Sequence, residues 1–356
     1  GSAAALVAVS NAQAADAIIV EPEPMEYVKV CDMYGAGYFY IPGTETCLKI
    51  SGDVRVQYTG DMYHDGDDIS HHDATVRARV RFTAKNETEY GTLGSDILAA
   101  WSVSDSADHD EFSQNEGHAN TAYISKATIN LAGFRTGFDN DGGGAWNRYA
   151  GYGYYNARSS GLYSFDSAIF FEYGGSAGNF NYVVGIQDSA RSGSAGQPDI
   201  YAAMSTSFGG LALGAAVIYD SNGSDVANTD GDGGIAYRIR ADYDLSSMLP
   251  GASIGAWWEA DNGETDYVKG HKWGVTMKAN LTDKMVMFAG YSQYDATNGS
   301  TPGADYQDWT VGVRWNVVSG LYIQPEWNKQ SADANLYNGN TESSRDRFTL
   351  RIVRSF

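Results

Sequence analysis

Arginines at alternate positions are the most distinctive chemical feature of this sequence. Arg77, Arg79 and Arg81 are separated by Ala78 and Val80. In an extended strand the three guanidinium groups share one face over about 13 Å, at about 3.3 Å per residue. An apolar core cannot hold such a face, because removing unpaired charge from water is very costly. We therefore expect these arginines to face water and opposing carboxylates.

Two acidic segments carry residue types that can bind metal ions. The segment 220–232 begins like a calcium-binding EF-hand loop, but Asp225 stands where that loop needs glycine and Gly231 where it needs a bidentate glutamate. We expect solvated loops and no cofactor, with loosely bound Ca²⁺ at the acidic loops as the alternative. The other segment combines three histidines with four aspartates: His64, His71, His72, Asp65, Asp67, Asp68 and Asp73.

Composition excludes several classes of protein. The 356 residues include 24 Lys and Arg against 44 Asp and Glu, a formal net charge of -20. Such a chain lacks the basic footprint of a nucleic-acid-binding protein. The longest apolar stretch, 210–219, is about half the length of a bilayer-spanning helix. No Ser-His-Asp or Cys-His arrangement stands out, so we expect no enzyme. The 42 glycines and 25 tyrosines favour a secreted or surface β-protein.

Apolar and polar residues alternate with period two from residue 47 onward, which is typical of strands with two different faces. Short turns alternate with long loops, and the pattern predicts about sixteen strands of the length that crosses a membrane. An even number places both termini on the side of the short turns, which is the periplasm in outer-membrane barrels. The predicted strands are 47–60, 72–85, 91–103, 120–132, 133–138, 165–174, 179–189, 199–208, 210–220, 233–244, 251–261, 268–281, 284–295, 306–317, 320–331 and 345–356.

A soluble sandwich also alternates, but two features favour a membrane barrel. Full charges stand in the middle of the polar faces, and aromatic residues stand near the ends of the apolar faces, as in the girdles of transmembrane barrels. We predict an all-β, 16-stranded antiparallel transmembrane barrel with apolar residues toward lipid and polar residues toward a water-filled lumen. The aromatic residues are Trp257, Trp258, Trp273, Trp309, Trp315, Tyr322 and Trp327.

The N-terminal residues indicate export. Residues 3–14 read AAALVAVSNAQA, typical of the end of a secretory signal peptide cleaved after Ala14. Export permits a disulfide between Cys31 and Cys47, the two cysteines of the chain. Such a bridge would stabilise the fold by about 3 kcal/mol; two buried free thiols are the alternative. The predicted organisation is a signal-peptide remnant at 1–14, a periplasmic or lumen-associated segment at 15–46 and a barrel at 47–356.

Both ends of the chain resemble a known family. Residues 28–52, VKVCDMYGAGYFYIPGTETCLKISG, resemble the N-terminal signature of the general outer-membrane porins of alphaproteobacteria, of the Rhizobiales type. The last strand, with Phe348, Leu350, Ile352 and a final Phe356, resembles the terminal strand that outer-membrane assembly machinery reads. Arg354 departs from the aromatic residue often found at its position. The resemblance implies a trimeric barrel in the outer membrane of a Gram-negative bacterium and passive diffusion of small hydrophilic solutes.

The resemblance also places the third long loop, 139–164, inside the lumen at the constriction. Asp139 and Asp141 lie near its root, and Arg148 and Arg158 lie further along. Opposite them, a basic wall would face the acids and create a transverse field that selects ions. The alternative is that these basic residues are scattered lumen charges paired with acids. Because the first and last strands of a closed barrel are neighbours, the wall comprises Lys49, Arg55, Arg77, Arg79, Arg81, Arg347 and Arg351.

The implied partners are outer-membrane lipid and lipopolysaccharide, two further copies of the chain in a homotrimer, the assembly machinery through Phe356, and small hydrophilic solutes. Two other functions stay open at this point. One is a channel specific for a sugar. The other is a surface adhesin or sugar-binding β-protein whose Trp and Tyr residues form the binding face.

Overall fold

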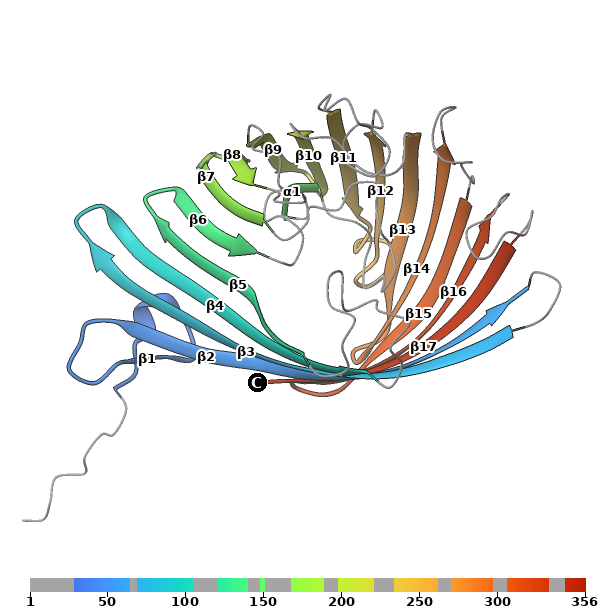
Figure 1. Ribbon diagram of the computed structural model, residues 1–356, viewed down its shortest axis with the longest axis horizontal. Coiled ribbons are helices and arrows are strands. Elements are labelled where there is room, and N and C mark those ends of the chain that lie inside the picture. Colours follow the sequence, from blue (N-terminus) through green and yellow to red (C-terminus); the bar gives the residue numbers. More distant parts are fainter. Residues whose placement is uncertain are drawn as a thin grey trace, which may run out of the picture.

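Antiparallel strands make up almost all of the described chain. The computed structural model describes residues 29–64, 69–104, 121–139, 148–150, 168–188, 198–220, 234–261, 270–296, 306–332 and 343–356. Sixteen strands of this part close into a barrel, because the last strand pairs with the first long one as well as with its predecessor (Figure 1). They are β2 (Cys47–Tyr63), β3 (Ile69–Thr88), β4 (Gly91–Ser104), β5 (Thr121–Leu131), β6 (Phe134–Asp139), β7 (Ala168–Ala177), β8 (Phe180–Asp188), β9 (Asp199–Phe208), β10 (Leu211–Asp220), β11 (Gly234–Asp244), β12 (Ser253–Asp261), β13 (Gly270–Thr282), β14 (Met285–Ala296), β15 (Tyr306–Val318), β16 (Leu321–Ala332) and β17 (Ser343–Ser355).

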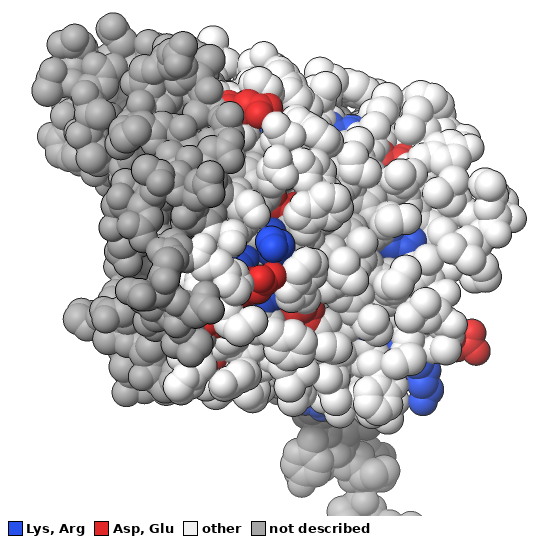
Figure 2. Space-filling view, turned by 90° about the vertical axis from the view of Figure 1, so that its right-hand side faces the viewer, with Lys and Arg blue, Asp and Glu red and all other residues white. Residues whose placement is uncertain are grey.

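The two faces of the barrel have the opposite polarity to a water-soluble protein. On β2, Val54, Val56 and Tyr58 expose 41–48% of their surface, whereas Gln57 and Thr59 expose 4% and 6%. Apolar side chains thus point outward and polar side chains inward, as the alternation predicted. In Figure 2 most of the described surface in view is uncharged. The described residues include no helix long and apolar enough to cross a membrane.

Tight turns connect consecutive strands at one end of the barrel. The turn between β5 and β6 has φ of 51° at Ala132 and 88° at Gly133, and the turn between β9 and β10 has 55° at Gly209 and 85° at Gly210. Positive φ at both central residues is the geometry of type I′ turns, whose twist matches that of paired strands. We call this the short-turn end. The strand β2 begins at this end, because Cys47 pairs with Lys85. The final residues of β17 also reach this end.

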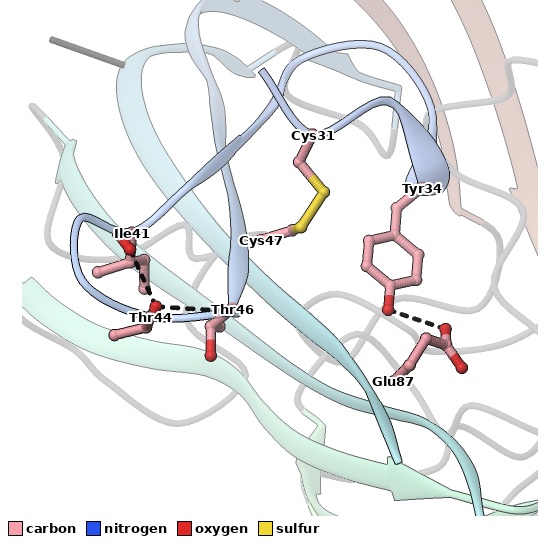
Figure 3. The surroundings of a disulfide bond; sticks show 7 residues. All are labelled: Cys31, Tyr34, Ile41, Thr44, Thr46, Cys47 and Glu87. Atoms are coloured by element: carbon pink, nitrogen blue, oxygen red, sulfur yellow. Dashed lines mark hydrogen bonds between the residues drawn. A yellow bond between two sulfur atoms is a disulfide. The ribbon is translucent and has the colours of Figure 1, made fainter. Parts of the chain in front are cut away.

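A disulfide anchors the N-terminal segment at the short-turn end. The segment contains the 3₁₀ turn η1 (Asp32–Tyr34) and the short strand β1 (Tyr38–Tyr40), which pairs with the beginning of β2. Cys31 and Cys47 are joined by a disulfide across this pairing (Figure 3). The predicted bridge is confirmed, and the alternative of two free thiols is wrong. The predicted signal-peptide remnant at 1–14 lies outside the described residues.

Polar contacts reinforce this anchor. Tyr34 donates a hydrogen bond of 2.8 Å to Glu87 on β3 (Figure 3). Partial burial and this hydrogen bond raise the pKa of Tyr34 to about 12. Lys85 Nζ lies 5.4 Å from the centroid of the Tyr34 ring, and Lys49 Nζ donates to the Ala36 carbonyl at 3.1 Å. The segment is therefore tied to both β2 and β3.

Replacing Cys31 and Cys47 together by serine should loosen the N-terminal segment. A bridge across a separation of 16 residues contributes about 3 kcal/mol, a factor of about 100 in the docking equilibrium. Limited proteolysis of the folded protein, read by mass spectrometry, should cut residues 29–46 faster in this variant while the barrel stays intact. Reduced wild type should behave like the variant. Equal cleavage rates in all samples would show that β1 pairing alone holds the segment.

Two details differ from the sequence prediction. The first long loop, predicted at 61–71, is shorter, because β2 and β3 stay paired as far as Tyr63 and Ile69. Not every aromatic residue predicted for the outer girdle faces outward. Trp257 is 3% exposed and packs inward over Gly274, and the Arg314 guanidinium lies 4.1 Å from the centroid of the Tyr322 ring on the inward face. Both side chains occupy strand positions in phase with inward polar residues.

Candidate pore-lining site

Four arginines from three neighbouring strands converge near the middle of β17, β2 and β3. Arg55 on β2 lies directly opposite Arg77 on β3. Arg79 Nη2 forms an ion pair of 2.8 Å with Asp53, and Arg77 Nη2 lies 4.0 Å from the same carboxylate. Arg351 on β17 stands two residues from Val353, the cross-strand partner of Arg55. We call Arg55, Arg77, Arg79 and Arg351 the central arginine group.

The central arginine group remains open to the interior of the barrel. The side chains of Arg77 and Arg79 retain 15% and 22% of their surface. Arg351 donates through Nε and Nη2 to Gln57 Oε1 at 2.9 and 2.7 Å, so a neutral amide rather than a carboxylate orients its guanidinium. Four cations and the Asp53 carboxylate therefore share one stretch of the inner wall.

The other members of the predicted basic wall have partners of their own. Lys49 contacts the N-terminal segment at the short-turn end. Arg81 pairs with Asp96 on β4, with Nε 2.6 Å from Oδ1. Arg347 Nε and Nη2 each lie 2.6 Å from an oxygen of Asp61. Since Lys49 and Asp61 are separated by about 40 Å of strand at 3.3 Å per residue, the structure divides the wall into three parts at different depths.

A row of ion pairs continues along the inward face from β4 to β7. Lys126 Nζ on β5 lies 3.9 Å from Asp96 and 3.1 Å from Asp139 at the end of β6. Arg135 Nη2 pairs with Asp139 at 2.8 Å, and Arg135 Nη1 with Glu172 Oε1 at 3.0 Å. Each carboxylate is thus shared by two cations, which compensates its removal from water.

Glu172 on β7 is the point at which the third long loop meets the wall. Its carboxylate is 3% exposed. Besides Arg135, it accepts hydrogen bonds from Arg148 Nη2 at 2.9 Å and from the Tyr201 hydroxyl at 2.9 Å. Arg148, predicted in the constriction loop, therefore anchors that loop. Sequence reasoning missed Glu172, although a lone charge between Phe171 and Tyr173 signals an inward position.

The described part of the third loop is the single helical turn α1 (Arg148–Ala150), which packs on the inward face of β8 to β11 beside β9 and β10 (Figure 1). Ala150 is fully buried there. A Cβ added at Gly214 on β10 would overlap the Tyr149 carbonyl oxygen, so this glycine makes room for α1. Arg238 Nη1 donates to the Ala150 carbonyl at 3.2 Å and closes the contact.

Two further buried cations belong to this wall and were missed from the sequence. Arg238 and Glu259 are both fully buried, and Arg238 Nε and Nη2 lie 3.1 and 3.0 Å from Glu259 Oε2. Lys272 is likewise fully buried, 3.5 Å from Asp308 and 3.2 Å from the Tyr306 hydroxyl. The partner of each lies on another strand, so it is found only once the strands are paired.

The acids predicted to oppose the basic wall are described only in part. Asp139 ends β6 rather than starting a free loop, and Lys126 and Arg135 balance its charge. Asp141 and Arg158 lie outside the described residues. The transverse field across the constriction therefore stays a prediction.

The metal-binding alternatives find no support in the described residues. In the ranges given above, no three His, Cys, Asp or Glu side chains cluster as a metal site. His64 lies 3.0 Å from Asp346, and the ring of His72 stacks on Tyr58. Residues 65–68 and 221–233, which carry most of the acidic loop residues, lie outside the described part. That the protein binds no cofactor remains a prediction.

The C-terminal residue completes the closure of the barrel. The backbone of Phe356 exchanges two hydrogen bonds of 3.0 Å with Gly52 on β2. Its ring is 60% exposed and lies over Gly52, where a Cβ would approach it to 2.7 Å. An exposed aromatic ring at the short-turn end is available to a partner outside the barrel.

Comparisons with known proteins agree with this architecture. A family model described as "Porin subfamily" matches residues 16–350. The porin Omp2a of Brucella ovis is 33% identical over 339 residues, which covers 90% of this chain and 83% of the relative.

Solved structures share the fold at lower identity. The outer membrane channel DcaP of Acinetobacter baumannii superposes with a TM-score of 0.65 at 13% identity and covers 89% of this chain and 99% of its own. The outer membrane protein OmpT of Vibrio cholerae, in a trimer form, gives a TM-score of 0.57 at 14% identity and covers 88% and 100%.

Proposed function

Because the chain belongs to the porin subfamily, we propose that it forms a water-filled channel in the outer membrane, through which small hydrophilic solutes and ions diffuse passively. One observation carries this function: charged residues line the inside of a closed barrel whose outside is apolar. Such a surface suits lipid outside and water inside. A soluble adhesin would place its apolar faces in a core, so this alternative does not fit the closed barrel.

We also propose finer features of the channel. The short-turn end, where β2 begins and β17 ends, faces the periplasm. The loop that carries α1 narrows the pore, because Glu172 and Arg238 hold it on the inner wall. Three copies associate in the membrane, as in the trimer form of OmpT. Lipid and lipopolysaccharide surround the apolar band, and assembly machinery reads Phe356. The chain catalyses no reaction.

Recording from planar bilayers tests the function directly. Folded protein at low concentration should give stable, ohmic current steps in potassium chloride, grouped in threes if each trimer inserts as a unit. A sugar-specific channel would instead show a current that one saccharide blocks at saturation. Folded protein that inserts into the bilayer but carries no current would contradict the proposed function.

A further inference from the structure

Polar side chains interrupt the apolar outside of the barrel near the start of β13 and the end of β14, at the end opposite the short turns. His271 and Asp295 lie directly opposite each other there. Both point outward, because their strand neighbours Lys272 and Tyr294 are buried on the inward face. His271 Nε2 lies 3.1 Å from Asp295 Oδ2, and both side chains stay partly exposed. A carboxylate on a lipid-facing wall is costly among acyl chains, so this level of the wall lies among lipid headgroups.

Hydrogen bonds extend this polar set along β14. Gln293 Nε2 donates to Asp295 Oδ1 at 2.7 Å, and the Tyr291 hydroxyl donates to Gln293 Oε1 at 3.2 Å. The Tyr291 ring lies between two tryptophans, with centroids 5.4 Å from Trp273 and 4.5 Å from Trp309. The polar residues thus reach from the headgroup level to the aromatic girdle. We call four of these residues the outer polar ladder: His271, Tyr291, Gln293 and Asp295.

An apolar groove of about 500 Å³ lies on the outside of β9 to β12, next to the ladder (Figure 1). Ala215 stands between Met204 and Ile239 on the neighbouring strands, and both of these larger side chains are exposed. Trp258, opposite Ile239, borders the groove, and its ring centroid lies 6.4 Å from that of His271. Small residues make room between larger ones, and the outward lining includes Met204, Leu213, Ala215, Ile239, Ala241, Ala256 and Trp258.

The depth of the groove determines what can fill it. Ala215 is the fifth of ten residues in β10, and Ile239 is the sixth of eleven in β11. The groove therefore lies halfway along strands that cross the membrane. Lipid headgroups stay at the membrane surface, so hydrocarbon is the part of a lipid present at this depth. A flexible acyl chain fits an apolar groove that opens toward lipid.

We propose that the outer polar ladder and the groove together bind one outer-leaflet lipid, with a hydroxyl-bearing sugar headgroup on the ladder and one acyl chain in the groove. This inference rests on the proposed function, which places the end opposite the short turns at the outer surface of the membrane. The Asp295 carboxylate and the Gln293 amide accept protons from hydroxyl groups. A carboxylate repels a phosphate, so hydroxyls determine which headgroup binds. Trp258, which touches both parts, aligns the chain with the headgroup.

Native mass spectrometry of the folded protein in detergent tests this site, with purified lipid A as the probe. Wild type should retain one lipid A per chain at concentrations at which phosphatidylethanolamine and phosphatidylglycerol are lost. The double variant Gln293→Ala, Asp295→Ala should need at least about tenfold more lipid A for half-occupancy, because it loses hydrogen bonds to the headgroup. Ala256→Phe fills the groove and should weaken binding to a similar extent while the ladder stays intact. Should this variant fail to fold, Ala241→Leu takes its place.

Each test variant has a matched control. His72→Ala removes an outward histidine near the start of β3, where its ring stacks on Tyr58. Ala99→Phe enlarges an outward alanine of β4, between Val80 and Ile124 on the neighbouring strands. Both controls should bind lipid A as wild type does.

Three results would overturn the lipid site. One is equal half-occupancy in wild type and in both test variants. Another is phosphatidylethanolamine bound as tightly as lipid A, which would contradict the sugar headgroup. The third is an Ala256→Phe variant that separates the protein into single chains with lipid binding unchanged, which would assign the groove to a second copy. All these variants should conduct as wild type does, because they alter only the outside of the barrel. Wild type without current would count against the channel function instead.

Discussion

Glu172→Ala should both destabilise the barrel and widen the pore. The carboxylate is buried and accepts hydrogen bonds from Arg135, Arg148 and the Tyr201 hydroxyl. The buried Tyr201 hydroxyl loses its acceptor and Arg135 keeps only Asp139, which costs about 1–3 kcal/mol. The loop that carries α1 loses the Arg148 anchor. We expect a larger single-channel conductance with more current noise, and unfolding at a lower temperature.

Two variants test whether this effect arises from the contact between Arg148 and Glu172, which holds α1 on the inner wall. Glu172→Gln keeps the shape and one acceptor oxygen, so its conductance and stability should lie between those of wild type and Glu172→Ala. Glu326→Ala removes another buried glutamate of the inner wall, on β16, where Gln324 donates to it at 3.0 Å. Its conductance should match that of wild type. An unchanged conductance in Glu172→Ala would show that Arg148 does not hold the loop across the pore.

The fold was largely predictable because apolar and polar residues alternate within each strand. A buried face and a lipid-facing face impose period two locally, and no long-range information is needed to detect it. The strand 199–208 was predicted with the limits that the structure shows for β9. The loops were less predictable, since the strand pair β2 and β3 extends into polar residues that read as a loop. Hydrogen bonding between the strands, rather than their composition, sets that limit.

The inner wall was less predictable, because charge pairs depend on register between strands. The partner of Arg81 could have been found by counting, since the tight turn between β3 and β4 pairs Thr88 with Gly91 and so brings Asp96 beside Arg81. The pair of Arg347 with Asp61 depends instead on how far the last strand is staggered against the first when the barrel closes. No turn in the sequence fixes that stagger.

Neutralising Arg77, Arg79 and Arg81 together by glutamine should shift ion selectivity toward cations. The substitution removes three positive charges from the inner wall and leaves Asp53 and Asp96, their present partners, as negative charges facing the pore. For an ion about 8 Å away in water, each unit charge contributes about 0.5 kcal/mol before screening. Three charges change the energy of a cation and of an anion by about 1.5 kcal/mol each, with opposite signs, so the ratio of cation to anion permeability changes by up to about a hundredfold, and by less at high salt.

The reversal potential across a potassium chloride gradient tests the central claim most directly, which is that this arginine face lines a water-filled pore. The triple variant should fold and insert, because its lipid-facing residues Val76, Ala78 and Val80 are unchanged. Its reversal potential should move toward the potassium equilibrium potential, and the shift should diminish as the salt concentration rises. A reversal potential equal to that of wild type, in protein that conducts normally, would mean that ions do not pass these side chains.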